Sequence, residues 1–194
     1  MKIEIDNLMV QSGVQFGTSG VRGLVIDMTD KVCWAYVTAF LQHLQQENLI
    51  EPGSEVGIAG DLRSSSERIM NAVAAAVSDF GLIPKNYGTI PSPAIALFGL
   101  EKSIPTIMVT GSHIPDDRNG IKFNTPAGEI LKADELQIRG QSVDVPEEQF
   151  SENGSLKQSG ALPVEQNDAN QFYIDRYLNF FPQNCLKELN IGLY

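Results

Sequence analysis

The chain has 194 residues, which is enough for one large domain or one domain with an extension but too short for a complete multidomain enzyme. Apolar residues make up 42% of the sequence and charged residues 20%, which is typical of a globular protein with a buried core and excludes a disordered chain. The formal net charge is −10 and no run of Lys or Arg interrupts it, which argues against a nucleic-acid partner because such a partner needs a positive surface.

The first predicted elements are two helices separated by a strand. Residues 30–48 carry apolar side chains at helical spacing and predict an amphipathic helix. Residues 56–60 predict a short buried strand. Ser64 as N-cap and Glu67 three positions later predict a capping box at the start of the second helix, which we expect to end at Gly81.

Two more strands and a short helix are predicted next. Residues 86–90 indicate a strand, residues 93–100 a helix that begins at a Pro-Ser-Pro sequence, and residues 106–109 another buried strand. Strands that alternate with helices in this way are typical of layered folds. The sequence therefore predicts an α/β fold in which a mixed β-sheet is layered between helices.

The last third of the chain is more polar. Residues 140–170 carry six acidic side chains against the single base Lys157, and we expect a solvated, loop-rich extension without chemistry. Residues 174–181 then predict a final amphipathic helix, and residues 190–194 resemble a strand that is just beginning. We expect that the sequence stops at a domain boundary, and a frayed terminal strand is the alternative.

Simple counts argue against a membrane-spanning helix and against a zinc site. The longest unbroken apolar stretch, residues 72–77, is far shorter than the ~20 residues of a membrane span, and the first residues lack the apolar core of a signal peptide. We therefore expect a cytoplasmic protein with no membrane partner.

Cys33 and Cys185 lie far apart and should both be reduced, with Cys33 packed on a helix. With only two histidines beside them, Cys and His are too few for a zinc site.

The chemistry-bearing residues gather in one segment, residues 110–122, directly after a buried strand. Gly111 lets the backbone approach a ligand, and Asn119-Gly120 predicts a tight turn that brings Lys122 back towards Ser112. A hydroxyl surrounded by an imidazole and cations suits phosphate handling. A surface turn with incidental charges is the alternative.

A serine hydrolase is a weaker interpretation of the same segment. The GxSxG pattern is absent because Thr110 stands where its first Gly would be. In addition, His113 is adjacent to Ser112, and we do not expect an adjacent histidine to fold back onto its neighbour's hydroxyl.

Three motifs in order, FGTSGVRG, GDLRSSS and TGSHIPDDRNGIKF, resemble the α-D-phosphohexomutase superfamily, which includes phosphomannomutases and phosphoglucomutases. The resemblance covers almost the whole chain and implies the first of four domains around a central cleft. It implies an N-terminal phosphoserine domain over residues 1–165, a connecting helix over 166–189, and the start of a truncated second domain over 190–194.

The resemblance also implies roles for individual residues of the first domain. Ser112 would carry a phosphoryl group, transfer it to a hexose 1- or 6-phosphate, and accept the other phosphate back from the resulting 1,6-bisphosphate. Lys122 would exchange a proton with the sugar hydroxyl. Arg22 would contribute fixed positive charge, and His113 would orient the serine loop or bind a phosphoryl oxygen, unless it is a water-exposed turn residue.

Further residues would support this site. Thr18 and Ser19 would line its mouth, and Asp61, Arg63 and Asn119 would brace the serine loop. A plain surface ion pair is the alternative for Arg63. The resemblance implies Mg²⁺, bound by the phosphorylated serine and by carboxylates from a loop outside this chain.

Two positions depart from the pattern of the superfamily, since Ile114 stands where Asn is usual and Gly60 where Arg is frequent. The choice of hexose phosphate is therefore not assigned. The sequence predicts the N-terminal part of a phosphohexomutase that acts with the remaining domains and is inactive alone. The alternatives are a non-catalytic module that binds a phosphosugar or a protein, and a phosphatase that uses Ser112 and admits water.

Overall fold

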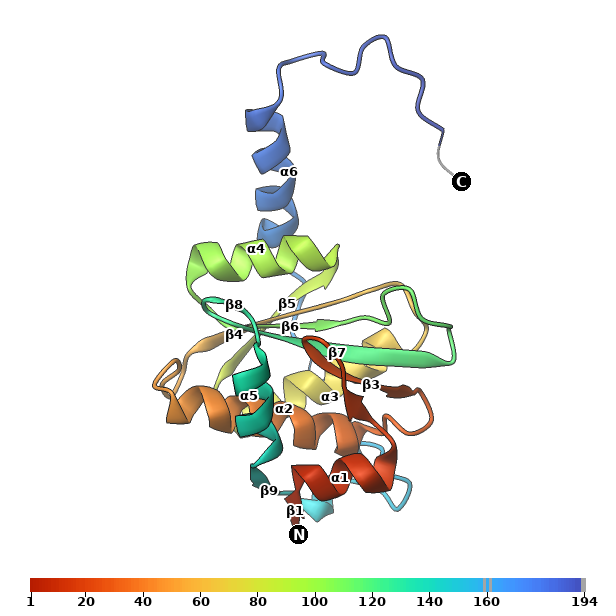
Figure 1. Cartoon of the computed structure of the whole chain (residues 1–194), viewed down its shortest axis with the longest axis vertical. Helices are drawn as coiled ribbons and strands as arrows, with labels where there is room; N and C mark the ends of the chain where they lie inside the picture. Colours follow the sequence, from red (N-terminus) through yellow and green to blue (C-terminus); the bar gives the residue numbers. More distant parts are fainter. Residues whose placement is uncertain (159, 161, 193–194) are drawn as a thin grey trace.

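A computed structural model of the protein describes residues 1–158, 160 and 162–192. Its centre is a seven-stranded mixed sheet in which the strands follow the order β2-β3-β7-β6-β4-β5, with β8 paired to β7 (Figure 1). The strands are β2 (Gln15–Phe16), β3 (Gly20–Leu24), β4 (Glu55–Gly60), β5 (Ile83–Thr89), β6 (Thr106–Val109), β7 (Arg118–Thr125) and β8 (Gly128–Glu129). Strand β4 is parallel to both β5 and β6, whereas β7 is antiparallel to β6 and β3.

Helices cover both faces of this sheet, which confirms the predicted fold class. Figure 1 shows α2 and α3 on one side of the sheet and α4 on the other, with α6 standing on α4 and pointing away from the body. The helices are α1 (Ile5–Ser12), α2 (Asp30–Gln46), α3 (Ser66–Asp79), α4 (Ser92–Lys102), α5 (Lys132–Arg139) and α6 (Asp168–Phe180). A small second sheet pairs β1 (Lys2–Glu4) with β9 (Ser142–Asp144), followed by a 3-10 turn at Glu147–Gln149.

Two apolar layers hold the sheet in place. The larger lies under α2 and α3, where Phe40 stacks on Phe123 of β7 with ring centroids 4.7 Å apart. The smaller lies under α4, where Phe98 meets Tyr87 of β5 and Phe172 of α6 edge-on. Burying a side chain of this size contributes about 1.5–3 kcal/mol, so these rings fix the helices to the strands that carry the site.

The start of α3 differs from the prediction. The helix begins at Ser66, and neither Ser64 nor Ser65 caps it, so the predicted capping box is wrong. The hydroxyls of Ser65 and Ser66 both accept hydrogen bonds from the buried Asn119 side chain, and Ser66 Oγ also donates to Asp61. Tertiary partners have therefore taken the hydroxyls that a local cap would use. The expected end is confirmed, because Gly81 follows the helix with a left-handed φ of 82°.

Other predicted elements are observed with shifted ends or additions. The strands expected at 86–90 and 106–109 and the helices at 30–48, 93–100 and 174–181 correspond to β5, β6, α2, α4 and α6. Strands β3 and β7 and helices α1 and α5 were not predicted. The extension at 140–170 is loop-rich but includes β9. Residues 190–192 form no strand, and Leu193 and Tyr194 lie outside the described residues.

Both cysteines are free thiols. Cys33 is fully buried on α2, where burial raises the pKa of its thiol to about 12 and makes it unreactive. Cys185 is exposed. Within the part of the chain that the structure describes, no helix combines the length and the apolar character needed to cross a bilayer.

Candidate active site

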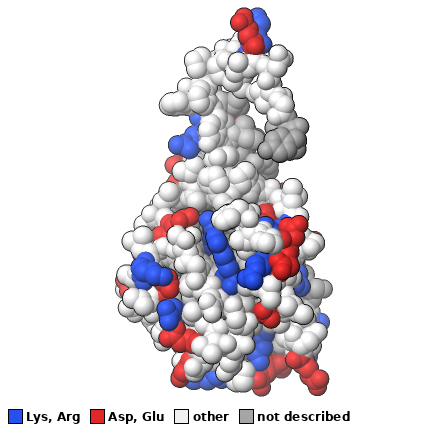
Figure 2. All heavy atoms as spheres, turned by 45° about the vertical axis from the view of Figure 1, so that its right-hand side comes forward, with Lys and Arg blue, Asp and Glu red and all other residues white. Residues whose placement is uncertain are grey.

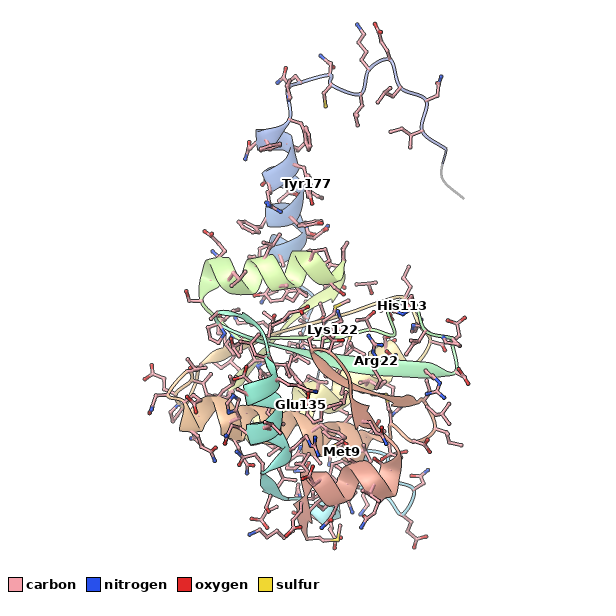
Figure 3. The ribbon with its side chains drawn as sticks, in the orientation of Figure 1. Met9, Arg22, His113, Lys122, Glu135 and Tyr177 are labelled. Carbon is pink, nitrogen blue, oxygen red and sulfur yellow. The ribbon has the colours of Figure 1, made fainter. Side chains whose placement is uncertain are left out.

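The parallel pairing of β4 and β6 brings two of the predicted motifs together. The loop at residues 61–65 follows β4 and the loop at residues 110–117 follows β6, so both leave the sheet at the same edge. The pairing continues into the loops, because the backbone N–H of Asp61 donates to the carbonyl of Val109 at 3.0 Å. Figure 3 shows His113, Arg22 and Lys122 in this same region of the molecule.

Ser112 lies in the second loop, the serine loop, three residues after the end of β6. Its backbone is left-handed, with φ 55°, and its side chain is exposed. A non-glycine residue rarely adopts this conformation, which costs on the order of 1 kcal/mol or more unless the surroundings hold it. One such contact is the Ser112 N–H, which donates to Thr110 Oγ1 at 2.9 Å.

His113 does reach its neighbour, contrary to the expectation. The Nδ1 atom of His113 lies 3.3 Å from Ser112 Oγ, within hydrogen-bonding distance. In extended backbone two adjacent side chains point apart, but the left-handed turn at Ser112 brings them to the same side. The hydroxyl and the imidazole are therefore paired at the surface.

Asp61 anchors the serine loop from below. Its carboxylate accepts hydrogen bonds from Thr110 Oγ1 at 2.8 Å, the Gly111 N–H at 3.1 Å, the Arg63 N–H at 3.0 Å and Ser66 Oγ at 2.5 Å. Partial burial raises the pKa of Asp61, but these four hydrogen bonds favour the charged form and hold the pKa below its ordinary value. The carboxylate is therefore ionised at neutral pH.

This lowered pKa predicts how stability depends on pH. An unfolded Asp titrates at about 3.9. The charged Asp61 thus stabilises the fold above that value, and the stabilisation is lost as the pH falls through the lower, folded-state pKa. Urea unfolding is expected to show that Asp61→Asn is less stable than the wild type at pH 7, and that the difference shrinks at pH 3. Asp117→Asn, an exposed change in the same loop, is the control. A difference that does not vary with pH would contradict this assignment.

Arg63 and Asn119 occupy the interior side of the two loops. The Arg63 side chain is only 13% exposed and forms ion pairs with Asp61 and Asp116. Asn119 is fully buried, and its Nδ2 donates to Ser65 Oγ at 2.8 Å and Ser66 Oγ at 3.1 Å. Asn119 thereby ties β7 to the first turn of α3.

The turn that returns the chain to Lys122 is not at the predicted position. Asn119 and Gly120 lie inside strand β7, and Gly120 pairs with Arg22 of β3. The reversal is instead made by residues 111–114 and 115–118, where Ile114 N–H donates to Gly111 and Arg118 N–H to Pro115. The side chain of Asn119 is needed in the core, so it cannot occupy an exposed turn.

The remaining predicted residues line a small hollow beside the serine loop. Pairing of β3 with β7 places Gly20 opposite Lys122. The hollow is lined by residues 18–22, Thr110 and residues 120–122, and so includes Thr18, Ser19, Arg22 and Lys122 but not Ser112. Thr18 is exposed, whereas Ser19 is 5% exposed and its carbonyl accepts a hydrogen bond from the Phe123 N–H. Thr110 connects the hollow to Ser112 through its hydroxyl.

Positive charge is available at this hollow. The Lys122 side chain is 28% exposed, and its Nζ lies 3.9 Å from a Glu129 carboxylate oxygen, a long and weak ion pair. Arg22 forms no ion pair with any of the described residues. Figure 2 brings this side forward and shows Lys and Arg in short groups, separated by uncharged surface and flanked by carboxylates. The arrangement suits a small anion.

Comparison with known proteins explains this combination of loops. Residues 13–147 match the family model of phosphoglucomutase/phosphomannomutase, alpha/beta/alpha domain I. The chain belongs to this phosphohexomutase family. It is 41% identical over 184 residues to a phosphomannomutase of Sinorhizobium fredii, covering 94% of this chain and 38% of that protein. It is 32% identical over 181 residues to a phosphoglucosamine mutase of Mycobacterium ulcerans, covering 92% and 38% of the two chains.

Solved structures show the same phosphohexomutase fold. A Thermus thermophilus protein assigned as a phosphomannomutase superposes with a TM-score of 0.69 at 20% identity, over 91% of this chain and 38% of that one. Parafusin, a phosphoglucomutase from Paramecium, gives a TM-score of 0.60 at 20% identity, over 88% and 35% of the two chains. The chain thus spans less than two fifths of the relatives it matches.

The predicted Mg²⁺ has no complete site in this domain. Among the described residues, no group of three or more His, Cys, Asp or Glu side chains is placed to bind a metal ion. Two carboxylates of the two loops, those of Asp61 and Asp116, are paired with Arg63. The residues present therefore fit only one part of a metal site, the oxygen that a phosphorylated Ser112 would provide.

Sequence reasoning missed the part that Thr110 plays in this phosphohexomutase domain. Its hydroxyl donates to Asp61 at 2.8 Å and accepts from the Ser112 N–H at 2.9 Å, so it connects the two loops. The available signal was its position, a hydroxyl residue between the end of a buried strand and the Gly-Ser pair.

Proposed function

We propose that this chain is the phosphoserine-bearing domain of a phosphohexomutase that moves phosphate between O1 and O6 of a hexose. The observation that carries the proposal is Ser112, an exposed residue in a left-handed conformation in a loop whose backbone is held by hydrogen bonds to Asp61 and Thr110. Family membership and the names of the relatives support hexose phosphates as the substrate class.

The proposed reaction begins with Ser112 phosphorylated. A free hydroxyl of the hexose phosphate attacks phosphorus, the bond from phosphorus to Ser112 Oγ breaks, and the product is the 1,6-bisphosphate. Lys122, entering the step as the neutral amine, takes the proton of the attacking hydroxyl, and the serine oxygen takes a proton from His113, whose Nδ1 lies 3.3 Å away. In the second step Ser112 Oγ attacks the phosphorus of the other phosphate and its proton returns to His113, while the bond from phosphorus to the sugar oxygen breaks and Lys122 gives its proton to that oxygen. Atoms and charge balance over the cycle.

Positive charge stabilises the transferring group. Arg22 and Lys122 border the same hollow, and we assign them to the phosphoryl oxygens and the sugar hydroxyl, with Thr18 and Ser19 at the mouth. Mg²⁺ would neutralise charge on the phosphoryl oxygens when bound. We infer that the further metal ligands and the contacts to the distal phosphate come from the remaining domains, so the isolated domain is inactive and the complete enzyme acts in the cytoplasm.

Mapping of covalent phosphate tests this proposal. The full-length enzyme, incubated with glucose 1,6-bisphosphate and digested, is expected to show one phosphate on the peptide that contains Ser112. The Ser112→Ala variant should show none after the same treatment. Phosphate on another residue, with Ser112 unmodified in an active enzyme, would overturn the assignment.

A further inference from the structure

Arg63 lies beneath the serine loop and binds its backbone at several points. Nη2 donates to the carbonyl oxygens of Ser112 at 3.4 Å and Ile114 at 2.5 Å. Nη1 donates to the carbonyl oxygens of Pro115 at 2.9 Å and Arg118 at 3.3 Å. Three carbonyls of the serine loop and the carbonyl of Arg118, the first residue of β7, therefore converge on a single guanidinium, and they would repel one another without a cation between them.

The same guanidinium is held by two carboxylates. Nε lies 3.4 Å from Asp61 Oδ2, the oxygen that also binds Thr110 and Gly111, and Nη1 lies 3.1 Å from Asp116 Oδ1. Both Nη atoms of Arg63 thus donate hydrogen bonds to the serine loop, and Nε is ion-paired with Asp61. Lysine could not reproduce this pattern, because its ammonium is a compact point charge without the planar fork.

Gly111 provides the space for this side chain. A Cβ atom at position 111 would lie 2.8 Å from Arg63 Nη2, and nearer still to Nε and Cζ. The φ of Gly111 is not in the left-handed region, so its backbone conformation does not require glycine. The missing side chain at position 111 is needed because the guanidinium occupies that volume.

We propose that Arg63 and Gly111 act as one device that positions Ser112 for phosphoryl transfer, with Arg63 as a positioning residue that does not touch substrate. This inference rests on the proposed function of Ser112. With its carbonyls turned in towards Arg63, the loop directs their negative ends away from the outer surface where the phosphoryl group would be carried. The device also holds the left-handed Ser112 in place. A displacement of about 1 Å at a reacting group costs on the order of 100-fold in rate.

Single variants of the full-length enzyme give the first test. Arg63→Ala is expected to lower kcat about 100-fold and to change KM far less, since substrate binding is not its task. Arg63→Lys should remain impaired, and guanidinium ion added well below denaturing concentrations should partly restore Arg63→Ala but not Ser112→Ala. Wild-type kcat in Arg63→Ala, or full rescue by Arg63→Lys, would overturn the proposal.

Arg68 provides a matched control. Its guanidinium also binds a carboxylate, Asp30, and the backbone carbonyls of Val25 and Met28, but its hydrogen bonds go to none of the described residues of the serine loop. Arg68→Ala is therefore expected to lower thermal stability without the selective loss of kcat. An equal loss of kcat in both variants would show that Arg63 acts only through stability.

A double-mutant cycle tests the pairing of the two residues. Gly111→Ala should lower kcat because the added methyl group displaces the guanidinium. In Arg63→Ala/Gly111→Ala that methyl group occupies the vacated volume, so the second change is expected to add little to the first. Penalties that multiply in the double variant would show that the two residues act independently.

Hydrogen exchange separates this proposal from that of the catalytic serine. Backbone amides of residues 111–118 are expected to exchange faster in Arg63→Ala and in Gly111→Ala than in the wild type or Arg68→Ala. This expectation does not depend on whether the variant is catalytically active. Faster exchange in an enzyme that remains active without Ser112 would support the loop device and refute the phosphoserine. Unchanged exchange would refute the device even if Ser112 carries phosphate.

Discussion

Ser112→Ala in the full-length enzyme is expected to lower mutase turnover by at least about 10⁴-fold, because no other group would carry the phosphoryl group between the two half-reactions. The substitution removes only the exposed Oγ atom and its contact with His113 Nδ1. The backbone contact from the Ser112 N–H to Thr110 is retained. The fold should therefore be unchanged, and kcat measured with glucose 1-phosphate and mannose 1-phosphate, Mg²⁺ and bisphosphate activator reports the chemistry.

Ser64 is the matched control for this experiment. It is an exposed serine in the neighbouring loop, and the structure shows that it does not cap α3. Ser64→Ala should keep near-normal turnover and the same melting temperature as Ser112→Ala. If Ser112→Ala kept near-normal turnover as well, the hydroxyl would have no part in the reaction.

Lys122→Ala is expected to lower kcat by about 10²–10⁴-fold, the usual contribution of a group that transfers a proton in the transition state. KM should change much less. The side chain projects from the interior of β7, which is paired on both sides by β3 and β6, so its backbone position does not depend on substrate. Its weak pairing with Glu129 leaves the ammonium available to a ligand.

A charge-preserving variant separates proton transfer from electrostatic binding. Lys122→Arg keeps the positive charge but cannot give up its proton, so it should remain as slow as Lys122→Ala. Lys85→Ala, which removes a half-buried strand lysine paired with Glu55 on β4, is the control for stability. Recovery of kcat in Lys122→Arg, or a rise in KM alone, would show that Lys122 binds phosphate and transfers no proton.

The elements predicted correctly are those that local pattern determines. Helix α2 and strands β4 and β6 consist of apolar residues at helical spacing or in short buried runs, and their pattern needs no knowledge of the neighbours. Strands β3 and β7 have glycine and charged residues in their sequences, GVRGL and RNGIKFNT, which resemble loops. They are strands because each pairs with a partner distant in sequence, which no local pattern reveals.

The candidate site divides in the same way. Residue type and position after a buried strand indicated phosphate handling in residues 110–122, with a surface turn as the alternative, and the roles of Ser112, His113 and Lys122 came only from the resemblance to the superfamily. The contacts of Arg63 could not be predicted, because they join residues more than 45 positions away through backbone carbonyls, which have no sequence signature. The wrong capping box has a related cause, since long-range partners took the serine hydroxyls.

The hairpin of β6 and β7 has a consequence for how the whole enzyme would work. Ser112 follows β6 and Lys122 lies on β7, and the two strands are joined by direct antiparallel pairing. Both residues belong to this domain, so a movement of neighbouring domains relative to it would leave the paired strands that carry them unchanged. Ser112 and Lys122 would thus keep their relative positions throughout the reaction. Exchange of the two ends of the bisphosphate would then require the sugar itself to turn over.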